Sequence, residues 1–320
     1  SFTETIPGTY VSNQPFGAAP GVSYQLLITT SDGGQYRSTE EQMLETPAID
    51  RIESDFQRFQ IAFFEADGTF QFSYDSEVEA NENKLYLIEW SETFLVKVPF
   101  PSRFVWLGEN EVAERPSSDE EEFCYRTERS RNIITYQSLL TSGAVQDYPL
   151  RTFESTGLNR MALRYSLEVK HYALSPTAFD YWQQLSQDQS DASGLIQVQV
   201  GAIRGNVSNL QDETEIVLGR FDVVDEEGRR EFYSPEDFES QGYQVLNDAA
   251  IECDTTGLVR SRQEEVGNIL SSNSNLDIWF IDNGIDFEQQ QAIPILVYLP
   301  KRCSNCTYYG TNERPTFWVE

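Results

Sequence analysis

Alternation of apolar and polar residues dominates the chain, and this period of two predicts a mainly β protein. The pattern is clearest in four stretches, at residues 24–29, 70–76, 84–90 and 164–174. In the last of these, "RYSLEVKHYAL", Leu167 and Val169 fall on one face of the expected strand while Glu168 and Lys170 fall on the other. Two further apolar runs, "LDIWFID" and "IPILVYL", predict a strand pair in the loop-rich C-terminal third.

Three glycine-containing motifs predict hairpin turns. "SDGG" (31–34) lies between "YQLLIT" and "QYRST", Asp67-Gly68 lies in "FEADGTFQF", and Glu227-Gly228 lies in "DVVDEEGRREF". A single hairpin within the first 50 residues cannot bury a sandwich core. The remaining strands of that unit therefore either lie upstream or come from elsewhere in the chain.

One helix is predicted near residues 176–187, in "LSPTAFDYWQQLSQDQ". Ser175 is a favourable N-cap residue, and Pro176 suits the first helical position because its missing N–H has no partner there in any case. Three apolar side chains share one face of this helix at three-residue spacing: Phe179, Trp182 and Leu185.

The segment "TPAID" (46–50) predicts a domain boundary. Pro47 disfavours helical backbone in the residue before it, so the segment is expected to be an extended linker. We predict a small all-β unit over residues 1–46 and a larger β-rich domain with one or two helices over residues 47–320.

The charge of the chain limits its partners. Its 320 residues include 23 basic and 52 acidic residues, which gives a formal net charge of −29. Such a surface repels nucleic acid and anionic lipid headgroups, so neither is expected as a partner. We find no apolar run long enough to span a membrane and no signal segment, and we expect a mature form or a fragment.

The chain has a single histidine, His171. A Ser-His-Asp triad needs a histidine that is free to act as a base, and a typical zinc site uses several histidines or cysteines. Because His171 lies in an alternating strand pattern, we interpret it as a packed or surface strand residue and not as a catalytic base.

The four cysteines are expected to form disulfides, because the number is even and the chain has the character of an exported protein. They are Cys124, Cys253, Cys303 and Cys306. A zinc site, a redox dithiol and free thiols remain as alternatives, and three pairings are possible. We predict a disulfide-closed C-terminal loop, with the tail at 315–318 packed against the body.

Binding residues can be proposed at two places. "DNGIDFE" offers Asp282, Asp286 and Glu288 as calcium ligands, although it lacks the spacing of a helix-loop-helix calcium loop and a polar turn is the alternative. No other cofactor is expected. Four aromatic residues are candidates for a partner interface, with core packing as the alternative: Trp106, Trp279, Tyr308 and Tyr309.

Taken together, these motifs resemble the Bacteroidota family called domain of unknown function 4249. The resemblance is carried by "RYSLEVKHYALSPTAFDYWQQLSQD", "GLIQVQVGAIRGNVSN", "VLGRFDVV" and, most specifically, the terminal "CSNCTYYGTNERPTFW". The matching positions are Tyr165, Ser175, Ala178, Tyr181, Trp182, Leu185, Gly205, Asn206, Gly219, Phe221, Cys303, Cys306, Thr307, Gly310, Thr311, Pro315, Phe317 and Trp318, with "CYRT" at Cys124 and "PAID" at 47–50.

The resemblance implies a lipid-anchored outer-membrane lipoprotein on the extracellular face of the cell, encoded beside a TonB-dependent transporter. In the family an immunoglobulin-like β-sandwich domain comes first, so residues 1–46 would be its C-terminal part. The lipidated N-terminal cysteine is not in this sequence, and contact with the membrane would be made through that lipid. No enzyme activity is assigned to the family.

Three functions follow as hypotheses. The first is a non-enzymatic accessory protein that captures substrate for a TonB-dependent transporter or another outer-membrane β-barrel complex. The second is an extracellular adhesion module that binds glycans or calcium. The third is an acid/base hydrolase using carboxylates such as Glu89 and Asp75, although with 52 acidic residues any pair carries little information.

Overall fold

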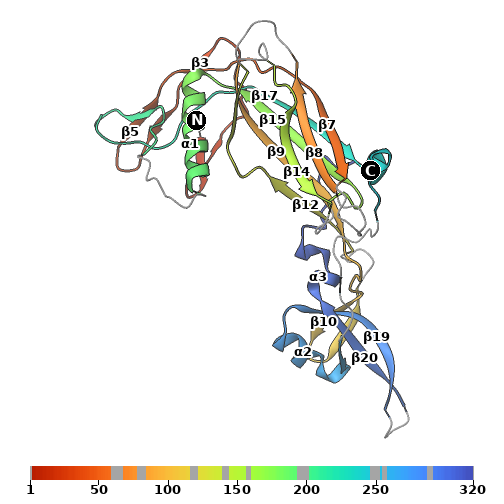
Figure 1. Cartoon of the computed structure of the whole chain (residues 1–320). Coiled ribbons are helices and arrows are strands. Elements are labelled where there is room, and N and C mark those ends of the chain that lie inside the picture. Colours follow the sequence, from red (N-terminus) through yellow and green to blue (C-terminus); the bar gives the residue numbers. More distant parts are fainter. Residues whose placement is uncertain are drawn as a thin grey trace.

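The structure is a computed structural model, and it confirms a mainly β protein, with 48% of residues in strands and 15% in helices. The residues that it describes are 2–58, 68–77, 84–115, 122–138, 144–155, 160–192, 202–245, 253, 258–286 and 291–319. Figure 1 shows a central body of strands with two smaller lobes attached to it.

The central body is a sandwich of two antiparallel sheets (Figure 1). The first sheet has the order β12 (Phe123–Arg129), β9 (Leu85–Lys97), β15 (Tyr165–Ala173) and β17 (Glu226–Tyr233), and β13 (Ile134–Gln137) also pairs with β9. The second sheet has the order β14 (Tyr148–Glu154), β8 (Gly68–Ser76) and β7 (Ile49–Arg58).

Aromatic side chains fill the space between the two sheets. Alternate residues of β8, β9 and β15 point inward, and Phe70, Phe72, Phe94 and Tyr165 are all at most 1% exposed. The rings of Phe72 and Tyr165, which come from opposite sheets, lie 5.2 Å apart between centroids. Rings of this size bury much apolar area, so this contact region is the main source of stability.

The predicted helix is confirmed as α1 (Pro176–Ala192), which extends past the expected end. The Ser175 hydroxyl accepts a hydrogen bond from the Ala178 N–H at 3.2 Å, as an N-cap residue does. The predicted apolar face packs on the outer side of β9, where Phe179 and Trp182 meet Leu85 and Leu87.

The N-terminal lobe lies beside α1 (Figure 1) and is made of short strands. These are β1 (Phe2–Ile6) with β2 (Thr9–Ser12), β3 (Ser23–Tyr24) with β6 (Glu41–Gln42), and β4 (Leu27–Thr29) with β5 (Gln35–Ser38) and β16 (Val207–Asn209). The predicted hairpin at 31–34 is therefore confirmed. Strand β16 comes from the larger predicted domain, so at least one strand of this lobe is supplied from elsewhere in the chain.

The predicted linker is held against the sandwich. The Thr46 N–H donates to Asp225 Oδ2 at 3.1 Å, the Thr46 hydroxyl donates to the Asp225 carbonyl at 2.8 Å, and the same hydroxyl accepts from the Ala173 N–H at 3.0 Å. Thr46 is 4% exposed. The division of the chain at residue 46 stays a prediction, but the segment there is a docked junction.

The C-terminal lobe, at the bottom of Figure 1, contains the predicted strand pair. Its strands are β10 (Phe104–Gly108) with β11 (Glu111–Glu114), and β18 (Val259–Arg262), β20 (Gln291–Pro300) and β19 (Leu276–Asp286) in that order. Its helical elements are α2 (Val266–Ser272), α3 (Lys301–Ser304), η3 (Gln263–Glu265) and η4 (Cys306–Tyr308), where η marks a 3₁₀ helix. A further 3₁₀ helix, η2 (Pro235–Gln241), packs on the sandwich beside β7. A separate cluster of Val266, Ile278, Leu296 and Tyr298 forms its core.

One predicted hairpin is present and another is wrong. Gly68 is the first residue of β8 and lies opposite Arg58, the last residue of the antiparallel strand β7, while Asp67 lies outside the described residues. A Cβ on Gly68 would come 2.1 Å from Phe56 Cζ, so glycine is needed there to make room for a ring. Gly228 lies inside β17 opposite Lys170, because the ladder between β15 and β17 continues on both sides of it.

His171 is a packed strand residue, as predicted. It is fully buried, its ring stacks on Tyr86 at 5.1 Å, and its Nε2 lies 2.7 Å from the Pro47 carbonyl oxygen. Burial lowers the pKa of His171 to about 4, and the hydrogen bond to Pro47 opposes this only in part. The imidazole is therefore neutral in the folded protein at neutral pH.

The depressed pKa of His171 makes folding stability depend on pH. Between the ordinary value of 6.5 and about 4, the unfolded chain binds a proton that the folded chain does not. We expect the free energy of unfolding to fall by about 3 kcal/mol from this group as pH drops through that range. Urea unfolding at a series of pH values measures the fall, and His171→Gln should reduce it.

The single imidazole resonance offers a direct check by NMR. Its titration midpoint in the folded protein should lie near the low value, and a midpoint near 6.5 would show that His171 is solvated.

Candidate functional site

A buried carboxylate joins the two sheets at one side of the sandwich. Glu92 of β9 is 0% exposed, and Arg151 of β14 binds both of its oxygens, with Nε to Oε2 and Nη2 to Oε1 each at 2.9 Å. The Tyr165 hydroxyl donates to Oε2 at 2.8 Å, and the Arg151 guanidinium lies 5.1 Å from the Trp90 ring centroid. The negative charge of the Glu92 carboxylate is thus compensated by the Arg151 guanidinium, and both of its oxygens are hydrogen-bonded, as a buried charge requires.

Arg160 extends this network outward to the edge strand β12. Its Nε donates to Glu92 Oε1 at 3.1 Å, and its Nη2 donates to Glu128 Oε2 at 3.1 Å. Arg126 holds the other oxygen of Glu128, with Nε to Oε1 at 2.7 Å. Three guanidinium groups and two carboxylates therefore form one connected cluster with an excess of positive charge.

Hydrogen bonding in the cluster fixes its protonation states. Burial acts to raise the pKa of Glu128, but the hydrogen bond and positive charge of Arg160 outweigh it, so the pKa is lowered. Burial, together with the nearby Glu92 charge, holds the pKa of Tyr165 well above its usual range. At neutral pH Glu128 is ionised and Tyr165 is a neutral donor, so neither is poised to exchange protons with a ligand.

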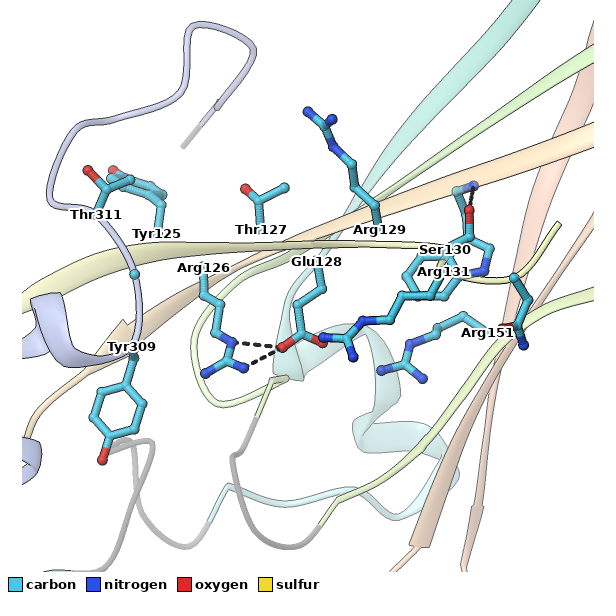
Figure 2. Close-up of a pocket in the computed structure, with 13 residues that line it drawn as sticks. Tyr125, Arg126, Thr127, Glu128, Arg129, Ser130, Arg131, Arg151, Tyr309 and Thr311 are labelled. Atoms are coloured by element: carbon cyan, nitrogen blue, oxygen red, sulfur yellow. Dashed lines mark hydrogen bonds and ion pairs between the residues drawn. The ribbon is translucent and has the colours of Figure 1, made fainter. Parts of the chain in front are cut away.

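A groove of about 1050 Å³ lies where this cluster reaches the surface. It follows β12 and is lined by four arginines, Arg126, Arg129, Arg131 and Arg151, with Glu128 as its carboxylate. Figure 2 shows that Arg129 points to one side of β12, whereas the other three arginines point to the side on which Glu128 lies. In a chain with a net charge of −29, this is a locally cationic surface.

Two disulfides hold the C-terminal segment beside the groove, which confirms the predicted oxidation of all four cysteines. Cys124 of β12 is bonded to Cys306, and Cys253 is bonded to Cys303. The two cysteines of the Cys-x-x-Cys motif thus have different and distant partners. Trp318 is 6% exposed, so the tail packs against the body as predicted.

The segment after Cys306 pairs with β12. The Tyr125 N–H donates to the Thr311 carbonyl at 2.7 Å, and the Thr311 N–H donates back to the Tyr125 carbonyl at 3.0 Å. A Cβ on Gly310 would lie 2.2 Å from the Tyr125 oxygen, so this close approach requires glycine.

The predicted interface aromatics are dispersed. Trp106 packs in the core of the C-terminal lobe and donates its indole N–H to the Glu109 carbonyl at 2.8 Å, while Trp279 packs on neighbouring rings. Tyr308 is 65% exposed, and Tyr309 lines the groove (Figure 2). Of the four candidates, only the tyrosines lie at or beside the groove.

Two of the predicted calcium ligands lie in one strand. Asp282 and Asp286 are four residues apart in β19, so their main chains are about 13 Å apart along the strand. Glu288 lies outside the described residues. Within the described ranges, no group of three His, Cys, Asp or Glu side chains could hold a metal ion, and the calcium hypothesis stays a prediction.

The two carboxylates considered for a hydrolase lie on opposite outer faces of the sandwich. Glu89 accepts a hydrogen bond from the Tyr172 hydroxyl at 3.1 Å on β9, and Asp75 pairs with Arg51 at 2.8 Å on β8. They cannot act on one bond.

The groove residues were missed from the sequence, although a local signal exists. "RTERSR" (126–131) carries three arginines in six residues of a chain with more than twice as many acidic as basic residues. Glu92, Arg151 and Arg160 carry no such signal, since they come from three separate stretches and none lies in a cluster of arginines like that at 126–131.

Comparison with known families identifies the family of this chain. The model of the family described as "Domain of unknown function (DUF4249)" matches residues 1–230. The chain belongs to this family. The DUF4249 match includes β12 and the buried cluster, whereas β18, β19 and β20 of the C-terminal lobe and the Cys-x-x-Cys motif lie beyond it. No curated protein and no solved structure matches the chain, and none of the helices within the described ranges is long and apolar enough to cross a membrane.

The buried network should dominate stability at this end of the sandwich. In Glu92→Gln two guanidinium groups lose a buried counter-charge, and we expect the free energy of unfolding to fall by about 3–5 kcal/mol in urea titrations. Glu53→Gln is the matched control, because Glu53 pairs with Arg51 at an exposed site. It should cause no comparable loss, and equal losses in the two variants would contradict the role given to Glu92.

The Cys124–Cys306 bond should stabilise the fold because it closes a loop with a sequence separation of 182. Replacing both cysteines by Ser is expected to lower the free energy of unfolding by about 2–5 kcal/mol, measured without reductant. The Cys253/Cys303 double serine variant opens a loop of 50 and should lose less. Unchanged stability in the first variant would contradict the argument.

Proposed function

We propose that this DUF4249 protein is a non-enzymatic accessory lipoprotein on the extracellular face of the outer membrane. It associates with a TonB-dependent transporter or another outer-membrane β-barrel complex and helps to capture substrate. A lipid at the N-terminus of the mature protein anchors it to the membrane. It acts by contact, through the arginine-lined groove.

The observation that carries this proposal is the chemistry of the groove, which favours binding over reaction. Its carboxylate, Glu128, is held ionised by Arg160 and Arg126. The chain's one histidine, His171, is fully buried in the core with a pKa of about 4. Fixed guanidinium groups with no adjacent base hold an anionic group in place but do not transfer protons.

The disulfides support an extracytoplasmic location. Both bonds tie strands or loops of one chain together, as structural disulfides of exported proteins do. The strongly acidic surface keeps the protein soluble outside the cell. The exposed Tyr308, next to the groove residue Tyr309, supports a contact with another protein because tyrosine is enriched at interface hot spots.

The proposal can be tested by recovering the protein from its own membrane in mild detergent after brief crosslinking. We expect a β-barrel transporter in a fixed ratio with the wild-type protein. Arg129→Gln/Arg131→Gln should lower that ratio by about tenfold, since it removes two groove charges.

The control for this test is Arg51→Gln/Arg229→Gln, which removes two arginines outside the groove and should leave the ratio unchanged. Recovery of the wild-type protein as a lone monomer would overturn the proposed function. Equal recovery of the transporter with both double variants would show that the groove is not part of the contact.

A further inference from the structure

The edge strand β12 has one open segment. Among the residues that the structure describes, β12 pairs with a strand on one side only, where its partner is β9. Leu95, the β9 residue opposite Tyr125, directs its N–H to the Arg164 carbonyl next to β15. The N–H and C=O groups of Tyr125 therefore point away from β9, and on that open side they form hydrogen bonds with Thr311. Because main-chain direction alternates along a strand, Thr127 and Arg129 also present their N–H and C=O groups to the open edge.

Both neighbouring parts of this edge are covered. At one end Thr311 is bonded to Tyr125. Beyond the other end, side chains of helix α1 bond the main-chain groups of Ile133. The Ile133 N–H donates to Gln189 Oε1 at 2.9 Å, and the Ile133 carbonyl accepts from the Ser186 hydroxyl at 2.7 Å. Folded proteins commonly protect a sheet edge in such ways, so an exposed gap between two protected stretches is a candidate for pairing with another chain.

The open segment has cations on both of its sides. Arg129 lies on one side, and Arg126, Arg131 and Arg151 lie on the other (Figure 2). Arg129 and Arg131 are exposed, and neither has an ion-pair partner within the described part of the chain. Side chains of an added strand would alternate between these two sides, so carboxylates at successive positions would each meet a guanidinium group.

We propose that the segment Thr127–Arg129 of β12 accepts an extended acidic segment of a partner protein as an additional strand. The bridge between Thr311 and Tyr125 is the same kind of pairing, made by this chain itself two residues before Thr127 in β12. Main-chain bonds would supply affinity, and the arginines would select for acidic side chains. The net charge of −29 opposes this little, because salt screens charges beyond about 8 Å at physiological ionic strength.

The inference rests on the proposed function, because it names the part of the partner that the accessory protein holds. Its first test measures fluorescence anisotropy of the intact protein with a short labelled peptide in which pairs of Glu residues alternate with pairs of Thr residues, so that carboxylates lie on both sides of the added strand. We expect saturable binding with a Kd below about 1 mM. The same peptide with alternate amides N-methylated, or with Gln in place of Glu, should bind at least about tenfold more weakly.

Thr127→Pro is the decisive variant. It removes the N–H at the open edge, where proline is tolerated, and leaves every arginine in place. Thr127→Val is its matched control, because it also loses the hydroxyl that contacts Thr93 at 2.9 Å but keeps the main-chain N–H. Peptide affinity should fall at least about tenfold in Thr127→Pro and stay near wild type in Thr127→Val.

Circular dichroism melting curves of both variants test whether they remain folded. If Thr127→Pro does not fold, the N-methylated peptide on the wild-type protein makes the same comparison. Equal binding of the N-methylated and plain peptides, or no saturable binding of either, would overturn the inference.

Recovery from native membranes separates this inference from the proposed function. If the transporter accompanies Thr127→Val but not Thr127→Pro, both are supported. A transporter that accompanies both variants equally would overturn the docking segment and leave the proposed function standing. A peptide that binds as expected while no β-barrel accompanies the wild-type protein would support the edge site and overturn the proposed function.

Discussion

The buried Glu92 carboxylate is the contact on which the rest of the structure depends. It is 0% exposed in the central strand β9, and its bonds to Arg151, Arg160 and Tyr165 connect both sheets of the sandwich. Leaving a buried carboxylate unpaired is strongly unfavourable, so these partners must stay in place whenever the protein is folded. The spacing between the sheet edges at β12 and β14 is thereby fixed.

The groove is a consequence of that arrangement. Guanidinium groups that neutralise Glu92 must come from the periphery, because arginine is rarely buried whole. Arg151 and Arg160 therefore point inward from the rim and bring excess positive charge to the surface there. The Cys124–Cys306 disulfide then holds the C-terminal segment against the end of β12, and helix α1 covers the neighbouring β13. Within the described part of the chain, the stretch of β12 from Thr127 to Arg129, which has arginines on both faces, is left without a pairing strand.

Local patterns in the sequence predicted the parts of the fold that local energetics decide. Alternation predicted the strands, Ser175 and Pro176 predicted the start of α1, and the even cysteine count predicted oxidation. Long-range pairing overrode the turn signal at Gly228, because that residue lies within the continuous ladder between β15 and β17. The site itself could not be predicted, since its charges come from strands separated widely in sequence and meet only through sheet pairing.

The most direct measurement of the central claim, that the protein acts through contacts along β12, is amide hydrogen exchange of the native membrane complex and of the isolated protein. The amides of Thr127 and Arg129 face the open edge and should exchange fast in the isolated protein and slowly in the complex. The Tyr125 amide, already bonded to Thr311, should be protected in both states. Unchanged fast exchange at Thr127 and Arg129 in the complex, with protection elsewhere on the surface, would contradict the account.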